Sequence, residues 1–197
     1  MKKKFILLLA IIMTASLSFI QAQTYKANPE KTAIIWHGEK VGGDHTGNIY
    51  LKSAEIEMSY EKPVSGTVVI DMSSIDNTDI QNDGMRKRLV DHLKSDDFFG
   101  VEKFPEAVFE ITGSERKNGG SIEIKGNITI KGITEPIEFV SNLSENEEDD
   151  LIFTGHIEID RTLFDVRFGS TKFFDNIADR AIDDMFTLDY ELYLEKE

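Results

Sequence analysis

The chain has 197 residues, of which 40% are apolar and 29% are charged, so its composition is that of an ordinary globular protein with one domain. It contains no cysteine, which excludes disulfides, thiolate metal sites and cysteine nucleophiles. The 22 lysines and arginines stand against 36 aspartates and glutamates, and the net charge of −14 argues against a nucleic-acid partner and against binding to an anionic membrane surface.

The first 22 residues have the three-part layout of a secretory signal peptide. Lys2–Lys4 precede nine apolar residues, Phe5–Met13, and a mixed segment then ends in Gln21, Ala22 and Gln23. The apolar run is shorter than the roughly 20 residues that span a bilayer, which disfavours the alternative of an uncleaved anchor helix. We therefore expect residues 1–22 to be removed. Residues 23–197 would form a periplasmic or secreted domain with no stable membrane insertion.

Alternating apolar and polar residues predict β-strands along most of residues 23–197. Five segments alternate clearly, and three weaker ones complete a set of eight strands. In one weaker segment the apolar phase slips, which predicts a bulge near Lys52 and Ser53. The clear strands are expected at 64–72, 107–111, 122–130, 151–159 and 186–194, and the weaker ones at 32–36, 48–58 and 135–142.

Short connections between these segments predict antiparallel pairing in an all-β fold. A sandwich and a closed barrel both remain open, and the long strands with continuous apolar faces favour the eight-stranded barrel, because closure removes exposed edges. The acidic run 144–150 is expected to be a hairpin loop. One helix is predicted between Asn82 and Phe99, capped by Asn82 or Asp83. The phenylalanine-rich stretch 162–184 is predicted to be a long irregular loop, of the kind that often covers a binding site.

The interior of an eight-stranded barrel is either filled by side chains or holds one slender ligand. Gly66, Gly126 and Gly155 lie on the predicted inward faces, where they indicate either room for a ligand or a bulge or barrel corner. A wall of Ile, Val, Leu and Phe offers no general base and no metal ligand, but it suits a hydrocarbon chain. The alternation predicts a lining made of Trp36, Ile49, Leu51, Val68, Ile70, Phe109, Ile111, Ile128, Ile130, Phe139, Phe153, Ile157, Phe164, Phe168, Phe173, Phe186 and Leu188.

Two polar segments contain candidate contacts for the head group of a lipid. His37, Lys40 and His45 lie close together in the sequence and would meet a phosphate or a quinone oxygen at the barrel mouth. The alternatives are that these histidines bond to backbone in a loop, or that they bind haem or a metal. Arg161 would hold an anionic head group, or would pair with Asp160 or Asp165 and so fix its own loop.

Three longer motifs together resemble the YceI-like family. His92–Phe109 resembles the family signature, Gly126–Ile137 a second motif, and Ile159–Phe164 with Phe168–Ser170 a third. The ordered set spans residues 25–194. The resemblance implies an eight-stranded antiparallel barrel, similar to lipocalins in shape, that binds a polyisoprenoid or another amphiphilic lipid along its axis. It supplies no catalytic constellation.

The sequence thus predicts an exported, non-enzymatic protein that carries or sequesters a polyisoprenoid, a quinone or a fatty amphiphile. One rival is an enzyme that acts on a lipid head group through His37, His45 and Asp44 as acid–base residues. The other rival is a protein-interaction module whose barrel is filled by side chains. Convergence of these three side chains would favour the enzyme, and an interior filled by side chains would favour the interaction module. No cofactor or metal is expected, and a homodimer stays open.

Overall fold

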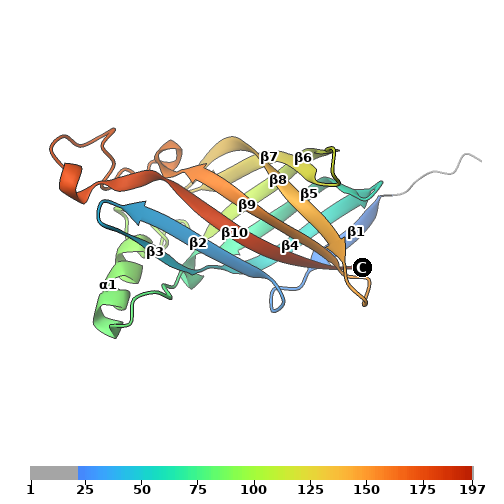
Figure 1. Cartoon of the computed structure of the whole chain (residues 1–197), viewed down its shortest axis with the longest axis horizontal. Helices are drawn as coiled ribbons and strands as arrows, with labels where there is room; N and C mark the ends of the chain where they lie inside the picture. Colours follow the sequence, from blue (N-terminus) through green and yellow to red (C-terminus); the bar gives the residue numbers. More distant parts are fainter. Residues whose placement is uncertain (1–21, 197) are drawn as a thin grey trace, which may run out of the picture.

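The computed structural model describes residues 22–196 and has the form of an elongated all-β barrel (Figure 1). The predicted antiparallel barrel with one helix is therefore confirmed, whereas the predicted signal peptide lies, except for Ala22, outside the described residues. The strands are β1 (Gln23–Ala27), β2 (Ala33–Lys40), β3 (Gly43–Asn48), β4 (Tyr50–Ser59), β5 (Lys62–Asp71), β6 (Glu106–Arg116), β7 (Ile122–Ile130), β8 (Ile133–Glu145), β9 (Leu151–Asp160) and β10 (Ile182–Lys196). The helices are α1 (Asp83–Lys94) and the short 3₁₀ turns η1 (Met72–Ser74), η2 (Arg161–Phe164) and η3 (Ala178–Arg180).

Eight of the ten strands form a closed ring in the order β1-β4-β5-β6-β7-β8-β9-β10, and β1 closes it by pairing with β10. Strand β1 occupies only the last residues of this edge of β10. Strand β2 of the hairpin β2–β3 pairs with the earlier part of the same edge, from Ile182 to Glu191. The predicted strand 32–36 therefore belongs to this hairpin and not to the closed ring. Strands β1 and β3 were missed, because neither has a clear alternation of apolar and polar residues.

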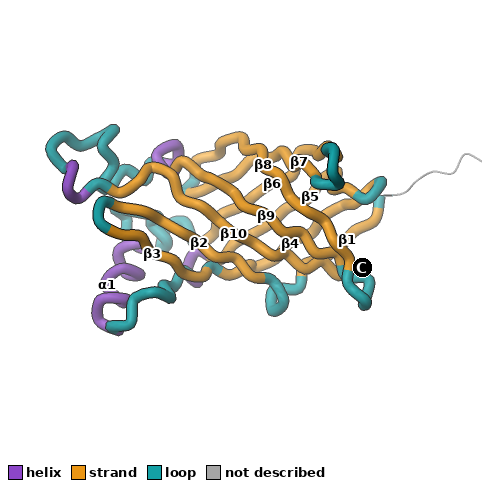
Figure 2. The backbone as a smooth tube through the Cα atoms, in the orientation of Figure 1, coloured by secondary structure: helices purple, strands orange, loops and turns teal. Residues whose placement is uncertain are grey.

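The irregular segments gather at the two ends of the barrel. Figure 2 shows the strands as a continuous wall, with loops and helices beyond their ends. Helix α1 and the segment 161–182 lie at one end, called here the helix end, and the C terminus and β1 lie at the other (Figure 1). The helix end is therefore covered by a helix and a long loop, whereas within residues 22–196 the opposite end carries neither.

Two local predictions are confirmed in the backbone. The register between β4 and β5 shifts between Leu51 and Ser53, which is the predicted bulge. Helix α1 begins after Asn82, whose side chain accepts a hydrogen bond from the Met85 amide at 3.0 Å. The helix ends at Lys94, before the predicted Phe99, because Ser95 leaves the helical conformation and its hydroxyl bonds back to the His92 carbonyl.

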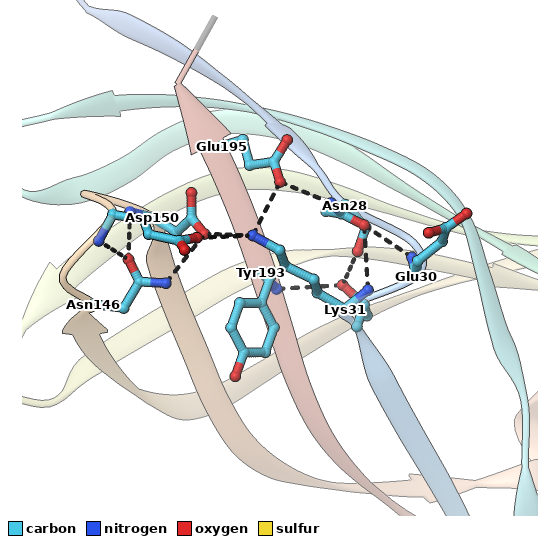
Figure 3. A network of polar contacts seen from close by, with 9 residues as sticks. Asn28, Glu30, Lys31, Asn146, Asp150, Tyr193 and Glu195 are labelled. Atoms are coloured by element: carbon cyan, nitrogen blue, oxygen red, sulfur yellow. Dashed lines mark hydrogen bonds and ion pairs between the residues drawn. The ribbon is translucent and has the colours of Figure 1, made fainter.

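The end opposite the helix is tied together by a network of charged and amide groups centred on Lys31. Figure 3 shows Lys31 between Asp150 and Glu195, at 3.0 Å and 3.4 Å respectively, with Asn28 donating to the same Glu195 carboxylate. The side chain of Asn146 donates to Asp150 at 3.1 Å. The network joins the β1–β2 and β8–β9 connections to β10. Leu194, next to Glu195 in β10, is fully buried.

Candidate functional site: an apolar cavity along the barrel

The interior of the barrel contains a cavity of about 210 Å³. By the same measure one water molecule needs about 10–15 Å³, so the space is more than ten times larger than a packing defect for a single water. Its walls are apolar side chains of the strands, and Leu93, Phe98 and Phe99 add the inner face of the helix end. The interior is therefore not filled by side chains.

Most of the sequence-predicted lining residues face this cavity. The alternation succeeds here because it fixes which face of each strand points inward. That these side chains contact a lipid stays a prediction. The predicted residues that line the cavity are Trp36, Ile49, Leu51, Val68, Ile70, Phe109, Ile111, Ile128, Ile130, Phe139, Phe153, Ile157, Phe186 and Leu188.

The three other predicted lining residues lie in the segment 161–182, away from the cavity walls. Phe164 is almost fully buried in the packed core. Phe168 packs edge-to-face on His92 of α1 with ring centroids 4.4 Å apart, and Phe173 lies under the Arg167 guanidinium at 4.9 Å. Placing these residues in the lining was wrong, because a non-repeating loop has no alternation from which the direction of a side chain follows.

Two of the three glycines on the predicted inward faces, Gly126 and Gly155, make room for aromatic rings of neighbouring residues, whereas Gly66 lies against backbone and side-chain atoms of Glu55 and Ile56. A Cβ atom on Gly155 would lie 2.7 Å from the Tyr190 hydroxyl, and one on Gly126 would lie only 2.4 Å from the Phe109 ring. The space that these two glycines leave is therefore occupied by protein and not by a ligand. The rings of Phe109 and Tyr190 thereby become part of the cavity lining.

Tyr190 illustrates how the strand register produces this arrangement. Ser141, Gly155 and Tyr190 are direct partners across β8, β9 and β10. The Tyr190 ring crosses Gly155, and its hydroxyl donates to the Ser141 oxygen at 2.8 Å. Burial raises the pKa of Tyr190 to about 12. The hydroxyl has its hydrogen-bond partner within the wall, so the lining stays apolar in character.

The exposure of the lining residues shows where the cavity approaches solvent. At the helix end, Asp183 and Met185 line the cavity and are also exposed. At the opposite end Pro63, Ile124 and Leu192 line it and are buried. The lining thus reaches exposed positions at the helix end, called here the mouth of the cavity, whereas at the Lys31 end, called here the sealed end, its residues are buried.

A bulge in β10 contributes to this mouth. Three residues of β2, Gly38–Lys40, stand opposite five residues of β10, Ile182–Phe186. The extra residues of β10 carry Asp183 and Met185 to the rim of the cavity. On the facing strand, a Cβ atom on Gly38 would meet nothing within 4 Å, so the wall is loosely covered at this point.

Arg161 lies at this end of the cavity and holds the loop in place. It is 2% exposed, and its guanidinium donates to the carbonyl oxygens of Val166, Phe168, Ile182 and Asp183 at 2.7–3.0 Å. Desolvation lowers the pKa of Arg161, although nearby aspartates, Asp184 first among them, act in the opposite direction. These contacts join the segment 161–182 to the start of β10.

The prediction that Arg161 fixes its own loop is therefore supported by geometry, with different partners from those expected. Asp160 pairs with Lys172, and Asp165 pairs with Arg167. The carboxylate near Arg161 is instead Asp184, at 3.7 Å. A head group at the mouth would meet a guanidinium whose donors are already largely engaged.

The histidines of the β2–β3 hairpin do not converge. His37 is a direct partner of Thr46, and His45 is a direct partner of Gly38, so the two histidines point to opposite faces of the hairpin. His37 pairs with Asp189 of β10 at 3.2 Å, and His45 pairs with Asp79 at 2.9 Å.

The remaining polar candidates of the hairpin are also outside the cavity. Asp44 and Lys40 are exposed and do not line it. Among residues 22–196 there is no group of three or more His, Asp or Glu side chains placed to hold a metal ion. Within the same residues no helix is long and apolar enough to cross a membrane.

Sequence reasoning missed several residues of the site. Phe98 and Phe99 follow α1 and line the cavity, but they lie outside any strand pattern. Tyr190 lines it too, and its position within the alternating segment 186–194 was the available signal. The Phe99 and Phe186 rings meet edge-to-face at 6.2 Å, which joins the helix end to the barrel wall.

Comparison with known proteins is consistent with this architecture. The barrel resembles the crystal structure of Burkholderia cenocepacia BcnA, with a TM-score of 0.68 and 20% identity over 85% of this chain and 98% of that one. It also resembles a polyisoprenoid binding domain from Saccharophagus degradans, with a TM-score of 0.65 and 13% identity over 89% and 99% of the two chains. At these identities the likeness establishes the fold.

Curated relatives match over a shorter segment. A UPF0312 protein of Yersinia pestis is 35% identical over 82 residues, and Protein YceI of Salmonella arizonae is 34% identical over 82 residues. Each match covers 42% of this chain and about two-fifths of the relative, 38% and 39% respectively. The model of the YceI-like domain, in contrast, matches residues 25–194, nearly all of the barrel. The chain therefore belongs to the YceI-like family.

Proposed function

We propose that this protein is exported and binds a long amphiphilic lipid, a polyisoprenoid, a quinone or a fatty amphiphile, inside its barrel. The observation that carries the proposal is the apolar cavity with one sealed end and one mouth. The fold-level likeness to a polyisoprenoid binding domain agrees with this ligand class. Export rests on the layout of residues 1–22.

The ligand would enter tail first. A polar group at the sealed end would lose its contacts with water, at a cost of about 2–7 kcal/mol if it found no hydrogen-bond partner. Each buried methylene group, in contrast, contributes about 0.8 kcal/mol, so a tail of ten methylenes supplies about 8 kcal/mol before the cost of ordering it. The head group would then stay at the mouth, near Asp183 and Met185.

Each of the two rival functions depends on a structural feature that the barrel of residues 22–196 does not have. An enzyme acting on a head group needs His37, His45 and Asp44 to converge, and the hairpin directs the two histidines to opposite faces. A filled-barrel interaction module needs an interior without free space, which a cavity of about 210 Å³ contradicts. Lipid carriage needs neither condition.

Native mass spectrometry of the purified protein, with organic extraction of any adduct, tests the proposal. We expect uptake of an offered polyprenol, quinone or fatty amide. Ala107→Phe would fill the cavity and abolish uptake, whereas Val108→Phe, on the opposite face of the same strand, would leave it intact. Circular dichroism would establish that both variants fold. A wild-type protein that takes up none of these lipids would refute the proposal.

A second comparison tests the orientation of the ligand. A fatty alcohol and the diol of the same chain length differ only in a terminal hydroxyl. We expect the alcohol to bind at least about thirtyfold more tightly, because the diol buries its second hydroxyl at the sealed end. Equal affinities would contradict tail-first binding. Whether the cavity binds lipid at all is decided by the uptake experiment.

A further inference from the structure

Exposed apolar side chains concentrate around the mouth of the cavity. Seven of the eleven large apolar residues that are exposed among residues 22–196 lie at the helix end, in α1, the β2–β3 turn and residues 161–185. Isolated exposed apolar residues are ordinary, whereas a group around one opening calls for an explanation. The seven residues are Val41, Met85, Leu163, Phe168, Phe173, Phe174 and Met185.

The charge of the chain is distributed unevenly between the helix end and the rest. Residues 83–104 and 161–185 together carry nine lysines and arginines against ten aspartates and glutamates. The other residues from 22 to 196 carry ten against twenty-five. The helix end is therefore close to neutral on a strongly acidic protein, and it is the part that an anionic surface repels least.

The loop that carries the exposed rings has a defined shape. The amides of Phe173 and Phe174 both donate to the Ser170 carbonyl, at 3.2 Å and 3.1 Å, which makes a tight turn at the tip. Both phenylalanine side chains remain nearly half exposed, at 44% and 47%. Arg167, which also pairs with Asp165, lies over the Phe173 ring, so a cation with its carboxylate partner accompanies the apolar surface. Aromatic rings with adjacent cations suit the interface of a lipid bilayer, where one side is apolar and the other wet.

We infer that the helix end docks on the surface of a lipid bilayer through the tip of this loop, with Phe173 and Phe174 entering the interface. At the same end of the barrel, Met185 is both exposed and part of the cavity lining. Docking there would let a lipid tail pass between bilayer and cavity without crossing water. The benefit of docking rests on the proposed function, lipid binding in the cavity. Docking itself is measured by vesicle binding, which does not require a bound lipid in the cavity.

Sedimentation of the protein with phosphatidylcholine vesicles tests the inference. We expect the wild-type protein to bind and the double variant Phe173→Asp/Phe174→Asp to bind at least about tenfold more weakly, since two charged groups replace two rings at the interface. The matched control is Tyr60→Asp/Val140→Asp, which adds the same charge at two exposed apolar positions outside the patch and should leave binding unchanged. Phe173→Ser/Phe174→Ser separates the loss of the rings from the added charge.

Several results would overturn the inference. These are no vesicle binding by the wild-type protein, or equal binding by the two double variants. A wild-type dimer in solution that only the phenylalanine variants dissociate, without vesicle binding, would make the patch an interface between two copies instead.

Loading from detergent-dispersed lipid separates docking from the proposed function. We expect the Phe173→Asp/Phe174→Asp protein to retain this loading while it loses loading from vesicles. Vesicle binding that depends on the two rings, in a protein that never retains lipid, would support docking and refute lipid carriage.

Discussion

Replacing Gly155 by alanine would test how the wall of the cavity is built. The new methyl carbon would lie 2.7–2.9 Å from three atoms of the Tyr190 side chain, so the ring would have to move inward and leave its hydrogen bond to Ser141. Overpacking costs about 1–3 kcal/mol, and the lost hydrogen bond costs about 0.5–1.5 kcal/mol. In the opposite direction, alanine stabilises a strand by about 0.5–1 kcal/mol relative to glycine, because it loses less conformational entropy on folding. The expected net destabilisation is about 0.5–4 kcal/mol.

Urea and thermal unfolding would measure this change. For a chain of this length we expect the Tm to fall by about 2–4 °C for each kcal/mol. Gly38→Ala is the matched control, because its added methyl group meets nothing within 4 Å, and it should be neutral or slightly stabilising. In a Tyr190→Leu background the cost of Gly155→Ala should largely disappear. Full stability of Gly155→Ala, or an undiminished cost in that background, would refute the role assigned to the glycine.

Three further predictions concern polar groups of the two ends and the wall. Arg161→Lys should destabilise the fold by about 2–4 kcal/mol in urea unfolding, since a lysine does not reach four carbonyl oxygens at once, and an unchanged midpoint would contradict this role. Because the pKa of Tyr190 is raised from 10.0 to about 12, its contribution is complete below pH 10 and is lost as the pH rises to about 12. Wild-type stability should then fall by about 2–3 kcal/mol more than that of Tyr190→Phe across this window. The hydrogen bond from Lys31 lowers the pKa of Asp150, which stabilises the fold at neutral pH and is lost as the pH falls through that lowered pKa. In Lys31→Met the pKa of Asp150, followed by NMR titration, should rise toward its ordinary range, and no movement would show that other groups set it.

The parts of the fold with a strict two-residue period could be predicted from the sequence. Alternation gives the inward face of a strand directly, and it placed Ile128, Phe139 and Leu188 correctly on the cavity wall. The direction of a loop side chain has no such rule, which is why Phe168 and Phe173 were misplaced. Whether an inward glycine makes room for a ligand or for a neighbouring ring depends on cross-strand register, which only the structure supplies.

Polar candidates were harder to assign for a related reason. A histidine in a hairpin points to one of two faces, and a shift of one residue in the strand register moves it to the other face. His37 and His45 are eight positions apart in the sequence, yet the hairpin pairs them with Thr46 and Gly38 and so separates them. From the sequence, Arg161 was expected to hold an anionic head group or to pair with Asp160 or Asp165. Its partners are backbone carbonyls, which leave no trace in the residue pattern.

An empty cavity of this size is costly for the folded protein, and this cost favours a bound ligand. At about 24 cal/mol per Å³, a cavity of about 210 Å³ corresponds to about 5 kcal/mol, comparable to the whole stability of many domains. Polar contacts hold both ends of the barrel around this space, the Lys31 network at one end and the Arg161 carbonyl contacts at the other. A lipid tail that fills the space would restore the missing packing. At a hundredfold excess over its Kd, such a ligand would raise the stability by about 2.7 kcal/mol. The filling variant Ala107→Phe would receive no such increase, because its interior leaves no room for the tail.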